Sequence, residues 1–428
     1  MTAALSPVPA SHDARRRRRT RALAGLLLAV AGTAAALAAV VASSVPVARL
    51  RTATPPGGSG PGHLRSGGRA AGGTGDGAIV PAADLVSDPV FVTLRVGFAL
   101  ETTEHDSLAV ERLARSDDAG RSWYVTGSPF PVAGDFTTLQ FISAEQGYIF
   151  GPSGLLVTSD GGTHWSQVVT LAGTLQRAIP IGSNVWATFT RCSGPPGLTR
   201  SCPVGVAISS DGGRRWRGAA DPPLRQAPGP AGGDILARYS LDTAYIVSYG
   251  PAGGGLAVTY DGARSWRRLA DPCSGAWGQV DVVSPSYDQL WLVCGALTAP
   301  GSLLQPKVAY RSFDGGRSWH LMASSGFAPG SAGPVGRLPL SGRVSQLATI
   351  SPERAWLGTG GLGVLVTFDA GRTWRLASGF AEGGSPSSAV GVTFNNSLDG
   401  WAIEFRSGVW HTTDALHWRL VDGRQAAG

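Results

Sequence analysis

Seven aspartates recur in one short motif, and carboxylates at regular spacing are the first residues to test for chemistry. The motif reads Ser/Thr-x-Asp-x-Gly-x-x-Trp, and the seventh copy is one residue shorter between Asp and Trp. Six copies also keep Gly or Ala two places after the Asp. The Asp and Trp residues of the seven copies are Asp118 and Trp123, Asp160 and Trp165, Asp211 and Trp216, Asp261 and Trp266, Asp314 and Trp319, Asp369 and Trp374, and Asp414 and Trp418.

The aspartates admit two interpretations, catalytic or metal-binding carboxylates on one side and turn-forming residues on the other. An Asp in a tight turn accepts hydrogen bonds from backbone N–H groups that would otherwise be unpaired. Gly adopts the backbone conformation that a side chain forbids, and Trp offers a large apolar face. Seven equivalent sites spread through the chain cannot converge on one substrate, so we predict turn fasteners and no catalytic, cofactor-binding or metal-binding residues.

The spacing of the motif predicts the architecture that must position it. Successive aspartates are 42, 51, 50, 53, 55 and 45 residues apart. A repeat of this length, with about four strands per unit, is typical of a β-propeller. We therefore expect an all-β, seven-bladed propeller of four-stranded antiparallel blades. Each second strand (strand B) carries one aromatic residue that we assign to the core, namely Phe98, Tyr148, Trp186, Tyr245, Trp291, Trp356 and Trp401.

Length variation between the repeats indicates where a ligand would bind. The four strands of each unit are labelled A to D in chain order. The extra residues lie between strands B and C of units one, three, four and five, and between strand D and strand A of the next unit. Both kinds of connection emerge on one face of a propeller, which we call the loop face. The motif turns lie on the opposite face, which we call the turn face. Loops on a rigid scaffold commonly carry function, so we expect binding on the loop face.

The four cysteines fit this layout. Cys192 and Cys202 bracket the B–C connection of unit three, and Cys273 and Cys294 meet on the loop face of unit five. An exported protein favours disulfides, so we predict the pairs Cys192–Cys202 and Cys273–Cys294. No pair has the short spacing of a zinc site.

The N-terminus differs in composition from the remainder of the chain. Residues 1–75 hold 10 of the 36 basic residues and one of the 29 acidic ones, which leaves 26 basic and 28 acidic residues elsewhere. A net charge near −2 excludes a domain-wide basic field for nucleic acid.

Residues 1–21 read as a basic cytoplasmic segment and residues 22–42 as a transmembrane signal-anchor. A cleaved signal peptide is the alternative. Residues 43–77 read as a disordered Gly/Pro/Arg linker and residues 78–424 as the propeller. The apolar stretch from Ala78 to Leu85 is predicted to add a strand beside the last blade.

Residues 140–165 carry the clearest family resemblance. They run from Gln140 through Gly147-Tyr148 to Thr158-Ser159-Asp160-Gly161-Gly162-Thr163-His164-Trp165. The motif resembles the Asp-box, or BNR repeat. The wider frame is similar to the photosystem II stability and assembly factor family of seven-bladed propellers, over roughly residues 84–422. That resemblance implies a non-enzymatic protein that binds protein partners outside a membrane.

Sialidases also carry Asp-boxes, but their arginine motif has only a misplaced counterpart here, in Arg177-Ala178-Ile179-Pro180. Lesser candidates are a cluster of Glu101, Glu104, His105 and Asp106 in the first B–C loop, the pair His411 and His417, and a ring of motif arginines. The ring comprises Arg121, Arg214, Arg264, Arg317 and Arg372.

The sequence thus predicts a monomeric, membrane-tethered, extracytoplasmic propeller that binds a protein or cell-envelope glycopolymer without catalysis. If the N-terminal segment is cleaved, the protein is secreted. A sialidase-like protein that binds or hydrolyses glycans is the alternative function.

Overall fold

The computed structural model describes residues 77–421, except for 82–83, 86, 88, 106–107, 128–129, 131–137, 152–153, 169–172, 192–200, 227–232, 251–253, 274–276, 300, 327–335, 381–389 and 405–407. The N-terminal anchor and linker that the sequence predicts, and the residue Cys192, therefore lie outside the described residues. No helix within the described ranges is long and apolar enough to cross a membrane.

The described chain forms seven antiparallel sheets, each built from one continuous stretch of sequence. Sheet one contains β1 (Ile79–Val80), β2 (Val90–Phe91), β3 (Gly97–His105), β4 (Leu108–Ser116) and β5 (Trp123–Thr126). Sheet two contains β6 (Thr138–Phe141), β7 (Gly147–Gly151), β8 (Gly154–Thr158) and β9 (Ser166–Gln167). Sheet three contains β10 (Thr174–Ile181), β11 (Asn184–Thr190), β12 (Cys202–Ser209), β13 (Arg217–Gly218) and β14 (Arg225–Gln226).

The remaining four sheets repeat the same order. Sheet four contains β15 (Gly233–Arg238), β16 (Ala244–Tyr249), β17 (Gly255–Thr259) and β18 (Arg267–Leu269). Sheet five contains β19 (Trp277–Val283), β20 (Leu290–Ala296), β21 (Lys307–Ser312), β22 (His320–Ser324) and a parallel edge strand, β23 (Gly336–Arg337). Sheet six contains β24 (Arg343–Ser351), β25 (Arg354–Gly360), β26 (Gly363–Thr367) and β27 (Arg375–Leu376). Sheet seven contains β28 (Val390–Phe394), β29 (Gly400–Glu404), β30 (Gly408–Thr412) and β31 (Arg419–Leu420).

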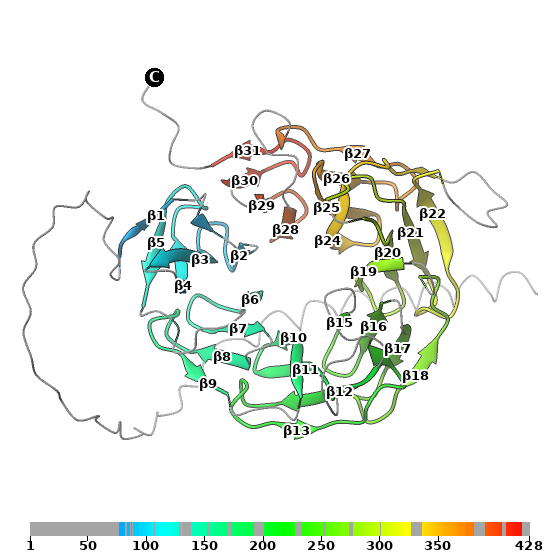
Figure 1. Ribbon diagram of the computed structural model, residues 1–428, viewed down its shortest axis with the longest axis horizontal. Coiled ribbons are helices and arrows are strands. Elements are labelled where there is room, and N and C mark those ends of the chain that lie inside the picture. Colours follow the sequence, from blue (N-terminus) through cyan, green and yellow to red (C-terminus); the bar gives the residue numbers. More distant parts are fainter. Residues whose placement is uncertain are drawn as a thin grey trace, which may run out of the picture. The chain divides into compact units, whose positions relative to one another are not determined.

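The sheets are the blades of a seven-bladed β-propeller, which confirms the predicted fold. Figure 1 shows β2, β6, β15, β24 and β28 near the middle of the ring and β9, β13, β18 and β31 toward the outside. In blade one the additional strand β1 lies beyond β5 at the outer edge. Within each blade, neighbours in the sequence pair as antiparallel hairpins. This local pairing explains why a short repeat with turn residues at fixed positions specifies the whole ring.

The seven strand-B aromatics are completely buried, as predicted for core residues. Each packs between its own blade and the next. The indole nitrogen of Trp356 donates to the carbonyl of Ala415 at 3.1 Å, which links blade six to blade seven. The indole of Trp401 donates to the carbonyl of Ala119 at the same distance, which links blade seven to blade one and closes the ring.

The segment from Ala78 to Leu85 differs from its prediction. Its strand, β1, pairs with β5 at the outer edge of the first blade rather than beside the last blade. Val80 and Leu85 nevertheless pack in one cluster with Trp401 and Val409 of blade seven. The apolar pattern showed that this segment is buried, but the pairing partner depends on which free strand edge lies within reach.

Candidate functional site

The motif aspartates are engaged inside their own turns. In all seven copies the Ser or Thr hydroxyl two residues earlier donates to the Asp carboxylate at 2.8 to 3.1 Å. In blade five the carboxylate also accepts the Ser318 backbone N–H at 2.9 Å and the Ser318 hydroxyl at 2.7 Å. The Ser312 hydroxyl in turn accepts the N–H of Gly316 at 2.7 Å. These contacts join the two strands of the hairpin and leave the carboxylate little capacity for a ligand.

Electrostatics agree with this geometry. Partial burial acts to raise the pKa of most of the seven carboxyls, but the hydrogen bonds within each turn outweigh it and lower the pKa of all seven. The pKa values of Asp261 and Asp314 fall to about 2. Such carboxyls are ionised throughout the physiological range, so they are poorly suited to act as general acids.

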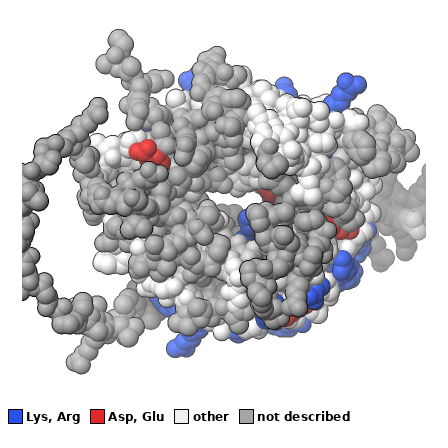
Figure 2. Space-filling view, in the orientation of Figure 1, with Lys and Arg blue, Asp and Glu red and all other residues white. Residues whose placement is uncertain are grey.

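A different set of ionisable residues lies on the first strands of blades three, four and five and at the end of the second strand of blade four. Arg177 is on β10, Asp234 on β15, Asp281 on β19 and Tyr249 at the end of β16. The Arg177 guanidinium acts electrostatically on all three other groups. We call these four residues the inner cluster. Figure 2 shows an opening in the middle of the ring, with a Lys or Arg surface and an Asp or Glu surface on its walls.

Strand register places the inner cluster on the loop-face side of the ring of buried aromatics. Arg177 pairs with Thr188, two residues beyond Trp186 along strand B. Asp281 pairs with Val293, two residues beyond Trp291. Asp234 pairs with Ser248, three residues beyond Tyr245. Because strand B runs from the turn face to the loop face, all three charged residues lie nearer the face on which binding was predicted.

Asp234 is the least satisfied member of the inner cluster. Its exposed fraction is 5%, and within the described chain neither carboxylate oxygen has a hydrogen-bond partner. Burial raises the pKa of Asp234 to about 6, and the nearby Thr188 hydroxyl and Arg177 guanidinium offset this effect only in part. The Thr188 hydroxyl itself completes no hydrogen bond. A buried carboxylate with a raised pKa and no partner is a frequent sign of a functional site.

Asp281 has a similar pKa but a different role. Burial raises its pKa to about 6, and backbone N–H groups and Arg177 lower it in part. One carboxylate oxygen accepts the Leu347 N–H of blade six at 2.7 Å, and the other accepts its own neighbour Val282 N–H at 2.9 Å. Asp281 therefore joins the inner strands of blades five and six. Gln346 repeats this device by accepting the Val392 N–H of blade seven at 2.8 Å.

β-Bulges adjust these inner strands. The pairing of β10 shifts between Leu175 and Arg177, and that of β24 shifts between Val344 and Gln346. Each bulge lies directly before one of the polar residues just described. A bulge changes the direction in which the following side chain points, so the inner strands present Arg177 and Gln346 where strict alternation would not.

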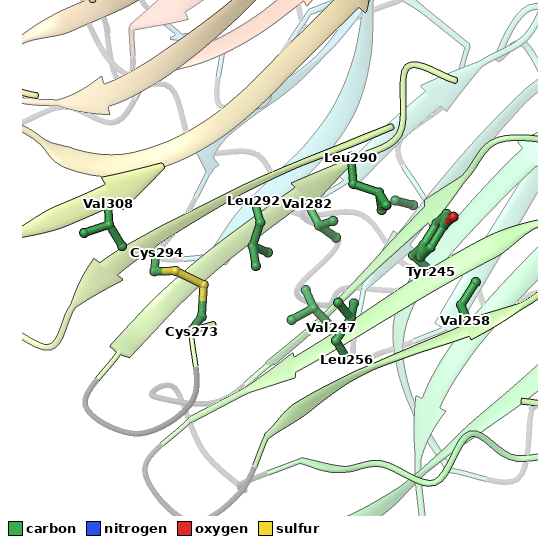
Figure 3. Close-up of a cluster of buried hydrophobic side chains, with 11 residues drawn as sticks. Tyr245, Val247, Leu256, Val258, Cys273, Val282, Leu290, Leu292, Cys294 and Val308 are labelled. Atoms are coloured by element: carbon green, nitrogen blue, oxygen red, sulfur yellow. A yellow bond between two sulfur atoms is a disulfide. The ribbon is translucent and has the colours of Figure 1, made fainter. Parts of the chain in front are cut away.

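The disulfide of blade five supports the same region. Cys273 and Cys294 are bonded, with their Cα atoms 5.7 Å apart, as predicted. Cys294 lies within β20 and pairs with Val280, the residue before Asp281. Figure 3 shows the bond beside the apolar side chains of Val282, Leu292 and Val308. The disulfide therefore fastens the connection that enters blade five to β20, the strand that pairs with the Asp281 strand β19. Cys202 is also disulfide-bonded, but its predicted partner lies outside the described residues.

Lys307 holds a second part of the loop face. Its ammonium group donates to the carbonyls of Pro339, Leu340 and Ser341 at 2.7, 3.3 and 3.0 Å. The side chain is fully buried, and burial lowers its pKa to about 8. This contact fixes the connection between blades five and six to the start of β21.

The lesser candidates of the sequence do not form a site among the described residues. Glu101, Glu104 and His105 lie within β3 rather than in a B–C loop, because the first hairpin continues as two nine-residue strands. Glu101 is buried opposite Arg112, and Asp106 lies outside the described residues. The described part of the chain contains no group of three potential metal ligands.

The histidine pair and the motif arginines also stay separate. His411 stacks on Trp401 with ring centroids 4.6 Å apart, whereas His417 contacts the Asp414 carboxylate at 2.6 Å within the last turn. All five motif arginines are exposed. Arg264, Arg317 and Arg372 each donate back to the carbonyl of their own motif aspartate.

Sequence reasoning did not find Asp234, Asp281 or Tyr249. Arg177 was considered only as a poor match to a sialidase motif. The one available signal was a charged residue inside an otherwise apolar inner strand, as in Gly233-Asp234-Ile235-Leu236. That signal does not reveal which blades bring such residues together.

The fold and the site define a seven-bladed propeller with a charged inner cluster toward its loop face, and comparisons with known proteins support the propeller fold. No protein-family model matches the sequence. A xyloglucanase from Paenibacillus sp. is 27% identical over 275 residues, which is 54% of this chain and 25% of that protein. The chain thus spans about a quarter of the length of this curated relative.

Solved structures show the same fold. YCF48 bound to D1 peptide has a TM-score of 0.50 at 18% identity, over 78% of this chain and 95% of that one. YCF48 from Cyanidioschyzon merolae has a TM-score of 0.52 at 13% identity, over 78% and 97%. An ancestral GH74 enzyme has a TM-score of 0.52 at 14% identity, over 82% and 47%. The resemblance to photosystem II assembly factor propellers is thereby confirmed at the level of the fold.

Proposed function

We propose that this chain is an extracytoplasmic binding propeller that engages a protein partner through its loop face. The observation that carries the proposal is the inner cluster, in which the buried Asp234 carboxylate accepts no hydrogen bond from any described residue. A carboxylate in this state costs folding free energy. A binding protein retains such a group when a bound ligand supplies the missing hydrogen-bond donors. The structural neighbour that holds a D1 peptide offers a parallel for peptide binding on this fold.

Affinity capture with the full-length chain tests this proposal. The chain would be extracted in mild detergent and used to capture proteins from the envelope of the organism that makes it. We expect one partner whose recovery falls when an exposed loop-face residue changes, as in Leu297→Asp at the start of the connection after β20. Its recovery should stay constant when the turn face changes, as in Arg317→Ala. A partner that depends on Arg317 and not on the loop face would contradict the proposal.

The proposal includes attachment to the membrane through residues 22–42. An uncharged run of 21 residues after a block of arginines supports this part. Fractionation of expressing cells, followed by mass spectrometry of the mature N-terminus, tests it. We expect the intact N-terminus in the carbonate-resistant membrane fraction. A chain that begins near residue 43 in the soluble fraction would show that the segment is a cleaved signal peptide.

Glycoside hydrolysis is the second candidate function, and two observations favour it. The xyloglucanase relative is similar over part of this chain. Asp234 and Asp281 are two carboxyls whose pKa values are raised to about 6, and hydrolysis by glycosidases uses paired carboxyls. Asp281, however, already accepts two backbone hydrogen bonds. Release of reducing sugar from xyloglucan by the purified chain, lost in Asp234→Asn, would establish this activity. Inertness toward xyloglucan and a panel of other glycans would exclude it.

A further inference from the structure

Within the described chain the Asp234 carboxylate oxygens accept no hydrogen bond, and several nearby polar groups are engaged elsewhere. Both oxygens of Asp281 accept backbone N–H groups. The side-chain amide of Gln226 donates to Gln176 at 3.1 Å, and the Ser248 hydroxyl donates to the carbonyl of Arg225 at 3.0 Å. These donors and acceptors are thus engaged elsewhere, whereas the Thr188 hydroxyl and the Arg177 Nε, like the Asp234 oxygens, have no partner within the described chain.

The inner cluster carries more negative than positive charge. Two carboxylates, Asp234 and Asp281, face a single guanidinium, that of Arg177, while Tyr249 is a neutral phenol. A ligand that completes this site must supply N–H or O–H donors, and a positive charge in addition would balance the cluster. Ammonium and guanidinium groups meet both requirements and form the stronger, charge-assisted hydrogen bonds.

Tyr249 lies on blade four, on the face opposite to the Asp234 side chain. A Cβ atom on Gly233, the residue before Asp234, would lie 2.5 Å from the Tyr249 hydroxyl oxygen. The phenol therefore occupies the space that a side chain at position 233 would fill, on the face of blade four that packs against blade five. Asp234, the next residue of β15, points to the opposite face, toward blade three.

We propose that Asp234 anchors a binding site for one cationic side chain, the ammonium of a lysine or the guanidinium of an arginine, presented by the protein partner. This inference rests on the proposed function, because it names the chemistry by which the loop face recognises a protein. The Asp234 carboxylate receives the cation, and Arg177 with Asp281 completes the charge pattern. A neutral sugar would supply donors but would leave the cluster negative.

Binding of small probes to the full-length chain tests the inference. The probes are Nα-acetyl-arginine amide, Nα-acetyl-lysine amide and the neutral isostere Nα-acetyl-citrulline amide, measured by saturation-transfer NMR at millimolar concentration. We expect at least one cationic probe to bind at least tenfold more tightly than citrulline. In Asp234→Asn this preference should disappear, while the melting temperature stays equal or rises. In Asp221→Asn, which changes an exposed carboxylate paired with Arg191, the preference should persist.

Three results would overturn the inference. The first is equal binding of the cationic and citrulline probes, and the second is an unchanged preference in Asp234→Asn. The third is binding of a xyloglucan oligosaccharide, lost in Asp234→Asn, without binding of either cationic probe. Failure here is distinguishable from failure of the proposed function. If a partner is captured on the loop face equally by the wild type and Asp234→Asn, the function stands and the cation site does not.

Discussion

At the scale of single residues, two kinds of aspartate in this chain behave in opposite ways. The motif aspartates lie at exposed turns, accept several hydrogen bonds and have lowered pKa values. Asp234 is buried, accepts none within the described chain and has a raised pKa. The contrast follows from solvation, because a carboxylate is stabilised by donors or water and destabilised by burial without either. The first kind should strengthen the fold, and the second should weaken it.

Replacement of a motif aspartate tests the first part. The Asp369 carboxylate accepts the Thr373 N–H at 2.9 Å, the Thr373 hydroxyl at 2.6 Å and the Thr367 hydroxyl at 2.9 Å. We expect Asp369→Ala to lower the free energy of unfolding by about 1 to 2 kcal/mol in urea titrations at pH 7. Because the pKa of Asp369 is lowered in the fold, this contribution is present above the unfolded pKa near 4 and is lost at lower pH. Asp221→Ala, the exposed control, should change stability by less than about 0.5 kcal/mol.

Replacement of Asp234 tests the second part. Since the pKa of Asp234 rises from 3.8 to about 6, the folded state binds this proton more tightly than the unfolded state. The carboxylate therefore costs stability above pH 6, and this cost disappears as the pH falls toward 4. We expect Asp234→Asn to raise the free energy of unfolding at pH 7.5 by about 1 to 3 kcal/mol, and by much less at pH 4. A variant that is less stable than the wild type at pH 7.5 would show that Asp234 is structurally satisfied.

At the scale of elements, the loop face is held by a few specific side-chain contacts and one disulfide in addition to short stretches of backbone pairing. The disulfide Cys273–Cys294 holds the connection into blade five, and Lys307 holds the connection between blades five and six. Gln305 assists Lys307, since its side chain accepts the Val344 N–H at 2.7 Å and donates to the carbonyl of Ala296 at 3.0 Å. These contacts give long connections a defined position, which a binding surface requires.

Removal of the Lys307 ammonium tests this fastener. In Lys307→Met the three carbonyls of residues 339–341 lose their shared donor. We expect a loss of about 2 kcal/mol in the free energy of unfolding, with faster hydrogen exchange in residues 338–344. Arg343→Met removes an exposed charge from the same segment and serves as the control. Unchanged exchange in Lys307→Met would mean that backbone pairing alone holds this connection.

At the scale of the whole molecule, stability depends on contacts between blades one and seven, where the chain must close the ring. Phe91 stacks on Trp401 with ring centroids 4.0 Å apart, and the Trp401 indole binds Ala119. Leu85 is fully buried in the same cluster. Because each blade covers the apolar face of the next, opening one interface exposes cores on both sides.

Two leucine substitutions, one at a buried and one at an exposed position, test how much the contacts between blades one and seven contribute to stability. We expect Leu85→Ala to lower the free energy of unfolding by about 3 kcal/mol through the lost transfer energy and the cavity that it leaves. Leu304→Ala, in which the leucine is 57% exposed, should change it by less than about 0.5 kcal/mol. Calorimetry should show a single lowered transition for Leu85→Ala. A separate early transition would indicate that the first blade unfolds independently of the ring.

The amino-acid sequence by itself determined the blades. Each blade forms from local hairpins whose turn residues, buried aromatics and spacing repeat along the chain, so pattern and period were sufficient to predict seven blades of four antiparallel strands. They did not predict the additional edge strands β14 and β23 of blades three and five. Cys273–Cys294 was predictable for the same reason, since both residues belong to one blade. Local signals also marked Ala78 to Leu85 as buried.

Only the tertiary structure decided what the blades bring together. Arg177, Asp234 and Asp281 come from three different blades, and each looks like an isolated charge in its own repeat. Their meeting depends on strand register, on a bulge in β10 and on the order of blades around the ring, all of which are long-range properties. The pairing of β1 with β5 was decided in the same way, by the strand edge within reach after the ring had closed.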